Sequence, residues 1–244
     1  MLTFSRRAML LASGLGLLSR VAEAHDHDVE PSLRIAAVPA SRDKVVALTF
    51  DACMGATDHR ILDTLVDNAI PATIFATHRW LRKNPEALAT LLAYRDLFQI
   101  ENHGDMHLPA ITDRASLYGL KTAGTLEAVR GEVDRGAAAV LAATGIAPRW
   151  FRGATARYST DAVAEITGEG YRIAGYSLNA DMGASLSAKS VARRMAAAKS
   201  GDVIIAHINQ PHRPSGAGVV DGILALQKSG TRFVRLEDVE TLAA

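Results

Sequence analysis

The sequence has one cysteine, almost no net charge and no apolar run long enough to cross a membrane. A single cysteine excludes an internal disulfide framework. The 27 basic and 26 acidic side chains nearly cancel, which excludes a strongly basic nucleic-acid binder. A charged fraction of 22% is ordinary for a globular protein, so extensive disorder is not expected.

Several motifs are also absent. No Gly-x-Gly-x-x-Gly turn or phosphate-binding loop follows a predicted strand, which removes the strongest argument for a nucleotide-binding sheet. No lysine stands at a strand end, where an aldolase or isomerase barrel would need one. No linker rich in proline, glycine or serine divides the chain beyond residue 43, so one domain over residues 43–244 is expected.

The N-terminus has the features of an export signal. Arg6 and Arg7 precede an apolar run of about 11 residues, far short of the roughly 20 that span a bilayer. Ala22 and Ala24 are small residues at the two positions that a signal peptidase reads. The pattern resembles a twin-arginine signal over residues 1–24. The alternative is a short membrane-anchored or buried N-terminal helix.

A leader is expected over residues 25–42, between this segment and the domain. Cleavage after Ala24 would leave no stable membrane anchor. The expected location is therefore outside the cytoplasmic membrane, in the periplasm or secreted.

Short apolar runs alternate with helical patterns along the rest of the chain. Most runs are apolar throughout, as in a parallel sheet that is covered on both faces. The expected strands are 45–50, 72–76, 97–101, 149–152, 171–176, 203–207 and 232–235, and the expected helices are 61–69, 126–143, 187–199 and 219–228. Seven strands alternating with helices predict an α/β protein. An open doubly wound sheet and a closed barrel fit this pattern equally well.

Polar side chains gather where these strands end. The carboxyl ends of the strands are the side on which α/β proteins bind ligands and barrels assemble catalytic residues. The residues concerned are Asp51, Asn102, His103, His107, Arg152, Asn179, Asp181 and His207.

His103 and His107 form the most specific local pattern among these residues. Two imidazoles at positions i and i+4 can lie on one side of a turn, and neutral imidazole is a common zinc ligand. The residue after His103 is Gly104, so the Glu of a zincin metalloprotease is absent.

Four motifs in this order resemble the polysaccharide deacetylase family, carbohydrate esterase family 4. They are Thr49-Phe50-Asp51-Ala52, the His103 to His107 pattern, Phe151-Arg152 and Ile204-Ile205-Ala206-His207. The resemblance implies a single-domain, distorted (β/α)7 barrel. It also implies hydrolysis of an N-acetyl amide, or less often an O-acetyl ester, on a carbohydrate.

The resemblance assigns a role to each site residue. A divalent metal ion, with zinc favoured, would be held by His103 and His107 and would polarise the acetyl carbonyl. Asp51 would accept the proton of the attacking water, and His207 would protonate the leaving group. Arg152 would hold Asp51 ionised and oriented.

The chain departs from the family pattern at the usual third ligand. The second Asp of the first motif is Ala52, whose methyl group cannot bind a metal. Three alternatives stay open: Asp51 coordinates the ion as well, water fills the position, or the metal affinity is low. Cys53 is a substitute ligand in principle, but a buried structural thiol is favoured because neighbouring side chains on a strand point oppositely.

Two loops also differ from the family pattern. The segment that begins at Arg152 continues Gly153-Ala154-Thr155-Ala156, and residues 179–183 lack the family's Trp. Asp181 in the second loop is expected to tune His207.

The sequence therefore predicts a periplasmic, metal-dependent deacetylase of an acetylated glycan or oligosaccharide. The rival is a carbohydrate-binding pseudoenzyme of the same fold, supported by the loss of the second Asp. The oligomeric state carries no signal in the sequence.

Overall fold

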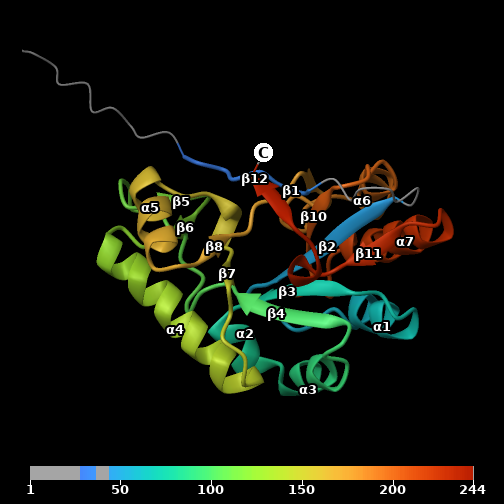
Figure 1. Cartoon of the computed structure of the whole chain (residues 1–244), viewed down its shortest axis with the longest axis horizontal. Helices are drawn as coiled ribbons and strands as arrows, with labels where there is room; N and C mark the ends of the chain where they lie inside the picture. Colours follow the sequence, from blue (N-terminus) through green and yellow to red (C-terminus); the bar gives the residue numbers. More distant parts are fainter. Residues whose placement is uncertain (1–27, 37–43, 244) are drawn as a thin grey trace, which may run out of the picture.

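Eight parallel strands form the central sheet of the computed structural model, which describes residues 28–36 and 44–243, and helices surround this sheet (Figure 1). Each of the seven predicted strands is present, and β9 is additional. The bounds are β2 (Val45–Ala52), β3 (Ala72–Ala76), β4 (Phe98–Asn102), β7 (Trp150–Phe151), β8 (Arg172–Ile173), β9 (Leu178–Asn179), β10 (Val203–His207) and β11 (Arg232–Val234). Their order is β8-β7-β4-β3-β2-β10-β9, and β11 pairs with the first residues of β2.

One short segment links the two edges of this sheet, which curls into a distorted barrel. Strands β8 and β9 lie at opposite edges of the sheet, yet only residues 174–177 separate them in the chain. The amide of Ala174 donates to the carbonyl of Phe151 at 2.9 Å, and the amide of Ser177 donates to the carbonyl of Val203 at 3.0 Å. The closing segment, residues 172–179, therefore joins the two edges. The expected distorted barrel in a single domain is confirmed.

Strand β2 shows why the sequence favours this fold. All eight of its residues are buried, because one face meets the barrel interior and the other meets the helices. Val46, Leu48, Phe50 and Ala52 pack in the outer apolar layer, between the sheet and the helices. The alternate residues point inward, which places Asp51 inside the barrel.

Seven α-helices are present in the described part of the chain: α1 (His59–Asp67), α2 (His78–Lys83), α3 (Pro85–Ala93), α4 (Leu126–Thr144), α5 (Thr160–Gly168), α6 (Ala188–Ala196) and α7 (Ser215–Lys228). Helices α1, α4, α6 and α7 correspond to the predicted ones. Asp58 caps α1, its carboxylate accepting from the amide of Arg60 at 3.2 Å. Gly145, at φ 76°, ends α4 in the left-handed conformation that glycine tolerates best.

The N-terminal segment joins the domain through a small second sheet. Strand β1 (Leu33–Ile35), part of the expected leader, pairs antiparallel with β12 (Thr241–Ala243). A further hairpin is made by β5 (Ser116–Leu117) and β6 (Leu120–Lys121). The expected export signal lies outside the described residues. None of the helices in the described residues has both the length and the apolar character needed to cross a membrane.

Candidate active site

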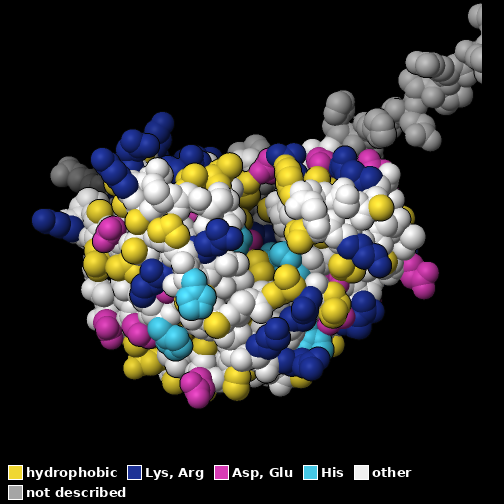
Figure 2. Space-filling view, turned by 180° about the vertical axis from the view of Figure 1, so that it is seen from behind, with side chains coloured by type: hydrophobic (Ala, Val, Ile, Leu, Met, Phe, Trp, Pro, Cys, Tyr) yellow, Lys and Arg dark blue, Asp and Glu magenta, His cyan; other side chains and the backbone are white. Residues whose placement is uncertain are grey.

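The predicted site residues meet at the carboxyl ends of the barrel strands. Asp51 lies near the end of β2, His103 and Arg152 directly follow β4 and β7, and His207 ends β10. Asp181 comes two residues after β9. The face shown in Figure 2 is hollowed near its centre, and histidine side chains are visible in the hollow.

Arg152 is fully buried and crosses the barrel interior to Asp51. Its Nη1 donates to Asp51 Oδ1 and to Thr49 Oγ1, each at 3.0 Å. Its Nε and Nη2 donate to the carbonyls of residues 174 and 175 at 3.0 and 3.1 Å, and its guanidinium lies 4.2 Å from the ring centre of Phe75. One side chain therefore holds both the carboxylate and the closing segment.

The pKa of Asp51 is below its ordinary value. Burial alone would raise this pKa, but the positive charges of His103, Arg152 and His207 outweigh burial and lower it. Asp51 is therefore an ionised carboxylate. Because Arg152 donates to Oδ1, Oδ2 is the oxygen that is turned toward His103, 3.7 Å from its Nε2.

The ring of His103 is oriented by the backbone behind it. Its Nδ1 donates to the carbonyl of Arg152 at 2.6 Å, so in the neutral ring Nε2 presents its lone pair to the site. Nε2 lies 3.5 Å from Cys53 Sγ. Burial would lower the pKa of His103, but the negative charges of Asp51 and Cys53 raise it.

Cys53, His103 and His107 form a group that could hold a metal ion. One ligand atom from each lies within 4.8 Å of the other two. Nδ1 of His107 is buried and has no hydrogen-bond partner among the described residues. Burial would raise the pKa of the Cys53 thiol, but the positive charges of His107 and His103 hold it well below its ordinary value. Cys53 is buried as expected, and imidazole rings lie beside its thiol.

The loop that carries both histidines is shaped by α4. Both carboxylate oxygens of the buried Glu132 accept from the amide of Met106, at 2.9 and 3.0 Å, and Oε1 accepts from the amide of Leu108 at 3.0 Å. Gly136 allows the close approach of this loop, since a Cβ there would lie 2.7 Å from the carbonyl carbon of Gly104. Gly104 itself has φ 91°, which favours glycine.

His207 forms a second oriented pair with Asp181. Nδ1 of His207 donates to Asp181 Oδ1 at 3.0 Å, and the amide of His207 donates to Oδ2 at 2.7 Å. Burial would lower the pKa of His207, but the negative charge of fully buried Asp181 raises it well above its ordinary value. The raised pKa favours the imidazolium form of this ring, in which Nε2 carries a proton.

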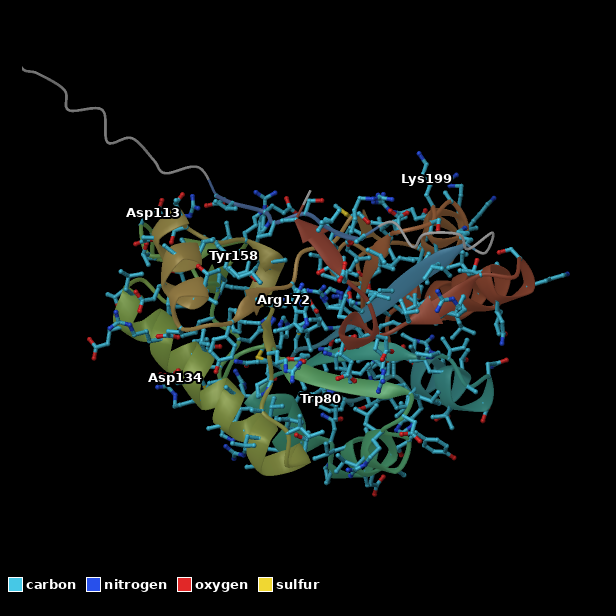
Figure 3. All side chains as sticks on the ribbon, viewed as in Figure 1. Trp80, Asp113, Asp134, Tyr158, Arg172 and Lys199 are labelled. Carbon is cyan, nitrogen blue, oxygen red and sulfur yellow. The ribbon has the colours of Figure 1, made fainter. Side chains whose placement is uncertain are left out.

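The structure brings together the six residues to which the sequence assigns a role, and it adds two. The sequence favours a structural thiol at Cys53 and predicts no role for Glu132. Glu132 lies on the apolar face of α4 between Val129 and Val133. A carboxylate among apolar residues on a buried helix face is the sequence feature that could have indicated its role. Asp134 in the same helix points to solvent, as most charged residues of a helix do (Figure 3).

The family model for polysaccharide deacetylase matches residues 39–174, more than half of the chain. The chain belongs to the polysaccharide deacetylase family. No match was found among curated protein sequences.

Solved structures of similar fold include both active and inactive proteins. The T48 deacetylase, solved with substrate, has a TM-score of 0.65 at 23% identity, covering 85% of this chain and 98% of that one. The peptidoglycan deacetylase PdaC of Bacillus subtilis has a TM-score of 0.64 at 21% identity, covering 81% and 90%. BA3943 of Bacillus anthracis, a CE4 family pseudoenzyme, has a TM-score of 0.62 at 19% identity, covering 81% and 66%. At these identities the likeness shows the fold alone.

Proposed function

We propose that this protein removes acetyl groups from a carbohydrate of the cell envelope in a metal-dependent hydrolysis. The observation that carries the proposal is the pair of oriented groups beside the Cys53, His103 and His107 cluster. Asp51 accepts from Arg152 at 3.0 Å, and His207 donates to Asp181 at 3.0 Å, pairings that favour a carboxylate at Asp51 and an imidazolium at His207. A base and an acid of opposite charge are what hydrolysis of an amide requires.

The donors present in the cluster fit a divalent ion. His103 and His107 would hold it, since one ring nitrogen is fixed toward the site by the carbonyl of Arg152 and another is buried without a partner among the described residues. When bound, such an ion polarises the acetyl carbonyl and makes a water molecule more acidic.

Asp51 and His207 each carry out one of the proton transfers. Asp51 accepts the proton of the attacking water at Oδ2, the oxygen to which Arg152 does not donate. His207 donates its Nε2 proton to the leaving nitrogen or oxygen, while Asp181 stabilises the imidazolium and keeps the ring in place. Arg152 keeps Asp51 ionised and aimed inward.

Acetate release from a panel of substrates tests this proposal. The panel holds acetylated chitooligosaccharides, peptidoglycan fragments and an O-acetylated glycan, each assayed with added zinc. Asp51→Asn and His207→Ala are each expected to lower turnover by about 10²- to 10⁴-fold. The matched controls are Asp63→Asn and His59→Ala, an exposed pair on α1 that should leave turnover unchanged. Turnover like that of the wild type in Asp51→Asn would contradict the mechanism.

A second candidate is a carbohydrate-binding pseudoenzyme. It is favoured by Ala52, which stands where the family has a second Asp, and one similar structure is itself a pseudoenzyme. This candidate predicts a metal-free protein that binds the same glycans and releases no acetate from any of them. Elemental analysis combined with the substrate panel separates the two candidates.

Export is the proposed route to an envelope substrate. Arg6 and Arg7 before an apolar run support a twin-arginine signal, and Ala24 supports cleavage there. Replacing both arginines by lysine should retain the protein in the cytoplasm, as measured by cell fractionation. Unchanged export of that variant would contradict this route.

A further inference from the structure

We propose that Cys53 is the third protein ligand of a zinc site whose other two ligands are His103 and His107. This inference rests on the metal dependence in the proposed function and names the ligand that replaces the missing carboxylate.

The geometry already gathers the three donors. Their ligand atoms lie within 4.8 Å of one another, and Cys53 Sγ lies 3.5 Å from His103 Nε2. Ligand atoms that bind one zinc ion at about 2.0–2.3 Å are separated from one another by distances similar to these. Small side-chain movements would therefore complete the site. The donors come from two separate loops, after β2 and after β4, which fixes the cluster through the barrel itself.

The other anionic side chains near the cluster are already engaged, since Glu132 accepts from the amides of Met106 and Leu108 and the two aspartates have cationic partners. Asp51 is paired with Arg152 at 3.0 Å, and Asp181 is paired with His207 at 3.0 Å. Ala52 has only a methyl group, and it packs in the outer apolar layer. Because the proposed function uses Asp51 Oδ2 as the base, Cys53 is the side chain left to supply negative charge to a dication.

Cys53 lies just beyond the end of β2, which explains how its side chain can face the histidines. Strand β2 ends at Ala52, so the alternation of side chains between the two faces of a strand does not continue to Cys53. Its side chain turns to the same side as Asp51, whose Oδ2 faces His103.

A thiolate ligand also selects the metal. When the bond between Sγ and the metal forms, the thiol gives up its proton to solvent. Thiolate and imidazole suit zinc, whereas magnesium, calcium and manganese prefer oxygen ligands. Three protein ligands leave the fourth position of a tetrahedral zinc ion open, as in catalytic sites.

X-ray absorption of the zinc-loaded protein tests the ligand directly. We expect one sulfur neighbour at about 2.3 Å in addition to nitrogen or oxygen neighbours at about 2.0–2.1 Å. Cobalt in place of zinc should give thiolate-to-metal charge-transfer absorption. Both signals should disappear in Cys53→Ser and persist in His59→Ala, which removes an exposed histidine remote from the cluster. A zinc shell of nitrogen and oxygen alone in the wild type would overturn the proposal.

A thiol reagent gives a second measurement that needs no variant. Cys53 is the only cysteine in the sequence, so the rate of alkylation by iodoacetamide reports this side chain alone. Zinc should slow the alkylation of wild-type protein. An alkylation rate that zinc leaves unchanged would overturn the proposal, and this result does not depend on whether a variant folds.

Metal competition completes the test. Cys53→Ser should weaken zinc binding by at least about tenfold, the lower end of the range for residues that merely support a ligand. Cys53→Asp should shift the preference from zinc toward manganese, because it exchanges sulfur for oxygen. An unchanged preference in Cys53→Asp would contradict the assignment. A sulfur-ligated zinc in a protein that releases no acetate would instead contradict the proposed function alone.

Discussion

Replacement of Arg152 by methionine should destabilise the protein more than any change of a surface arginine. Methionine retains much of the volume of the side chain but none of its four hydrogen bonds, which reach Asp51, Thr49 and the carbonyls of residues 174 and 175. It also removes the guanidinium that lies over the ring of Phe75.

The expected loss in the free energy of unfolding follows from the burial of both Arg152 and Asp51. Removing one member of a buried ion pair costs about 3–5 kcal/mol, because the other charge stays buried without compensation. We expect a loss of this size in the free energy of unfolding, against a total of about 5–15 kcal/mol for a typical domain. Arg157→Met is the control, since that arginine forms a partly exposed pair with Glu30 at 2.9 Å. It should cost less than about 1 kcal/mol.

Urea unfolding followed by tryptophan fluorescence measures both losses, since Trp80 and Trp150 are buried. The loss in Arg152→Met should also depend on pH. Asp51 has a lowered pKa, so its stabilisation is present above the ordinary pKa of an aspartate and is lost as pH falls through the lowered value. The difference between wild type and Arg152→Met should therefore shrink in acid. A loss at neutral pH no larger than that of Arg157→Met would refute this reasoning.

Three further changes test the surroundings of the site. Glu132→Gln should weaken zinc binding by about 10- to 100-fold, measured against a chelator, because the carboxylate holds the loop over residues 106–108. Gly136→Ala should cost about 1–3 kcal/mol in thermal or urea unfolding, because its Cβ would lie 2.7 Å from the carbonyl carbon of Gly104. Burial would raise the pKa of Asp161, but its hydrogen bonds lower it. Asp161→Asn should therefore destabilise the protein at pH 7 and not in strong acid, by less than about 1 kcal/mol because solvent screens this exposed carboxylate.

The main strands and four of the helices could be predicted because their burial is visible in the sequence. Strand β2 is buried along its whole length, and α4 shows helical spacing of valines over 19 residues. Helix α2 has only six residues, and in α3 and α5 the apolar residues are less confined to one face than in α1 and α6, which have the same length. Strands β1 and β12 pair with each other although most of the chain lies between them, and no local sequence pattern predicts such a pairing.

The candidate site could also be predicted only in part from the sequence. His103, His107 and His207 could be selected because their residue types and their positions at strand ends are chemically specific. The direction of the Cys53 side chain could not be predicted, because side chains alternate between the two faces only within a strand and β2 ends one residue earlier. The pairing of Asp181 with His207 was expected from the comparison with the family pattern and not from local periodicity, because the path of the loop after β9 is set by tertiary contacts.

The loss of the family's second Asp is weak evidence for a pseudoenzyme once the energetics of the site are considered. Buried ion pairs are often no more stabilising than apolar side chains of similar volume, so stability alone does not favour keeping them. This barrel nevertheless buries Arg152 with Asp51 and Asp181 with His207, and it places a thiol among imidazoles. Charged groups held at such cost at the carboxyl ends of barrel strands are typical of sites that do chemistry. On the proposed function, Ala52 removes one oxygen ligand, while the proposed acid His207, the proposed base Asp51 and the thiol of Cys53 all remain.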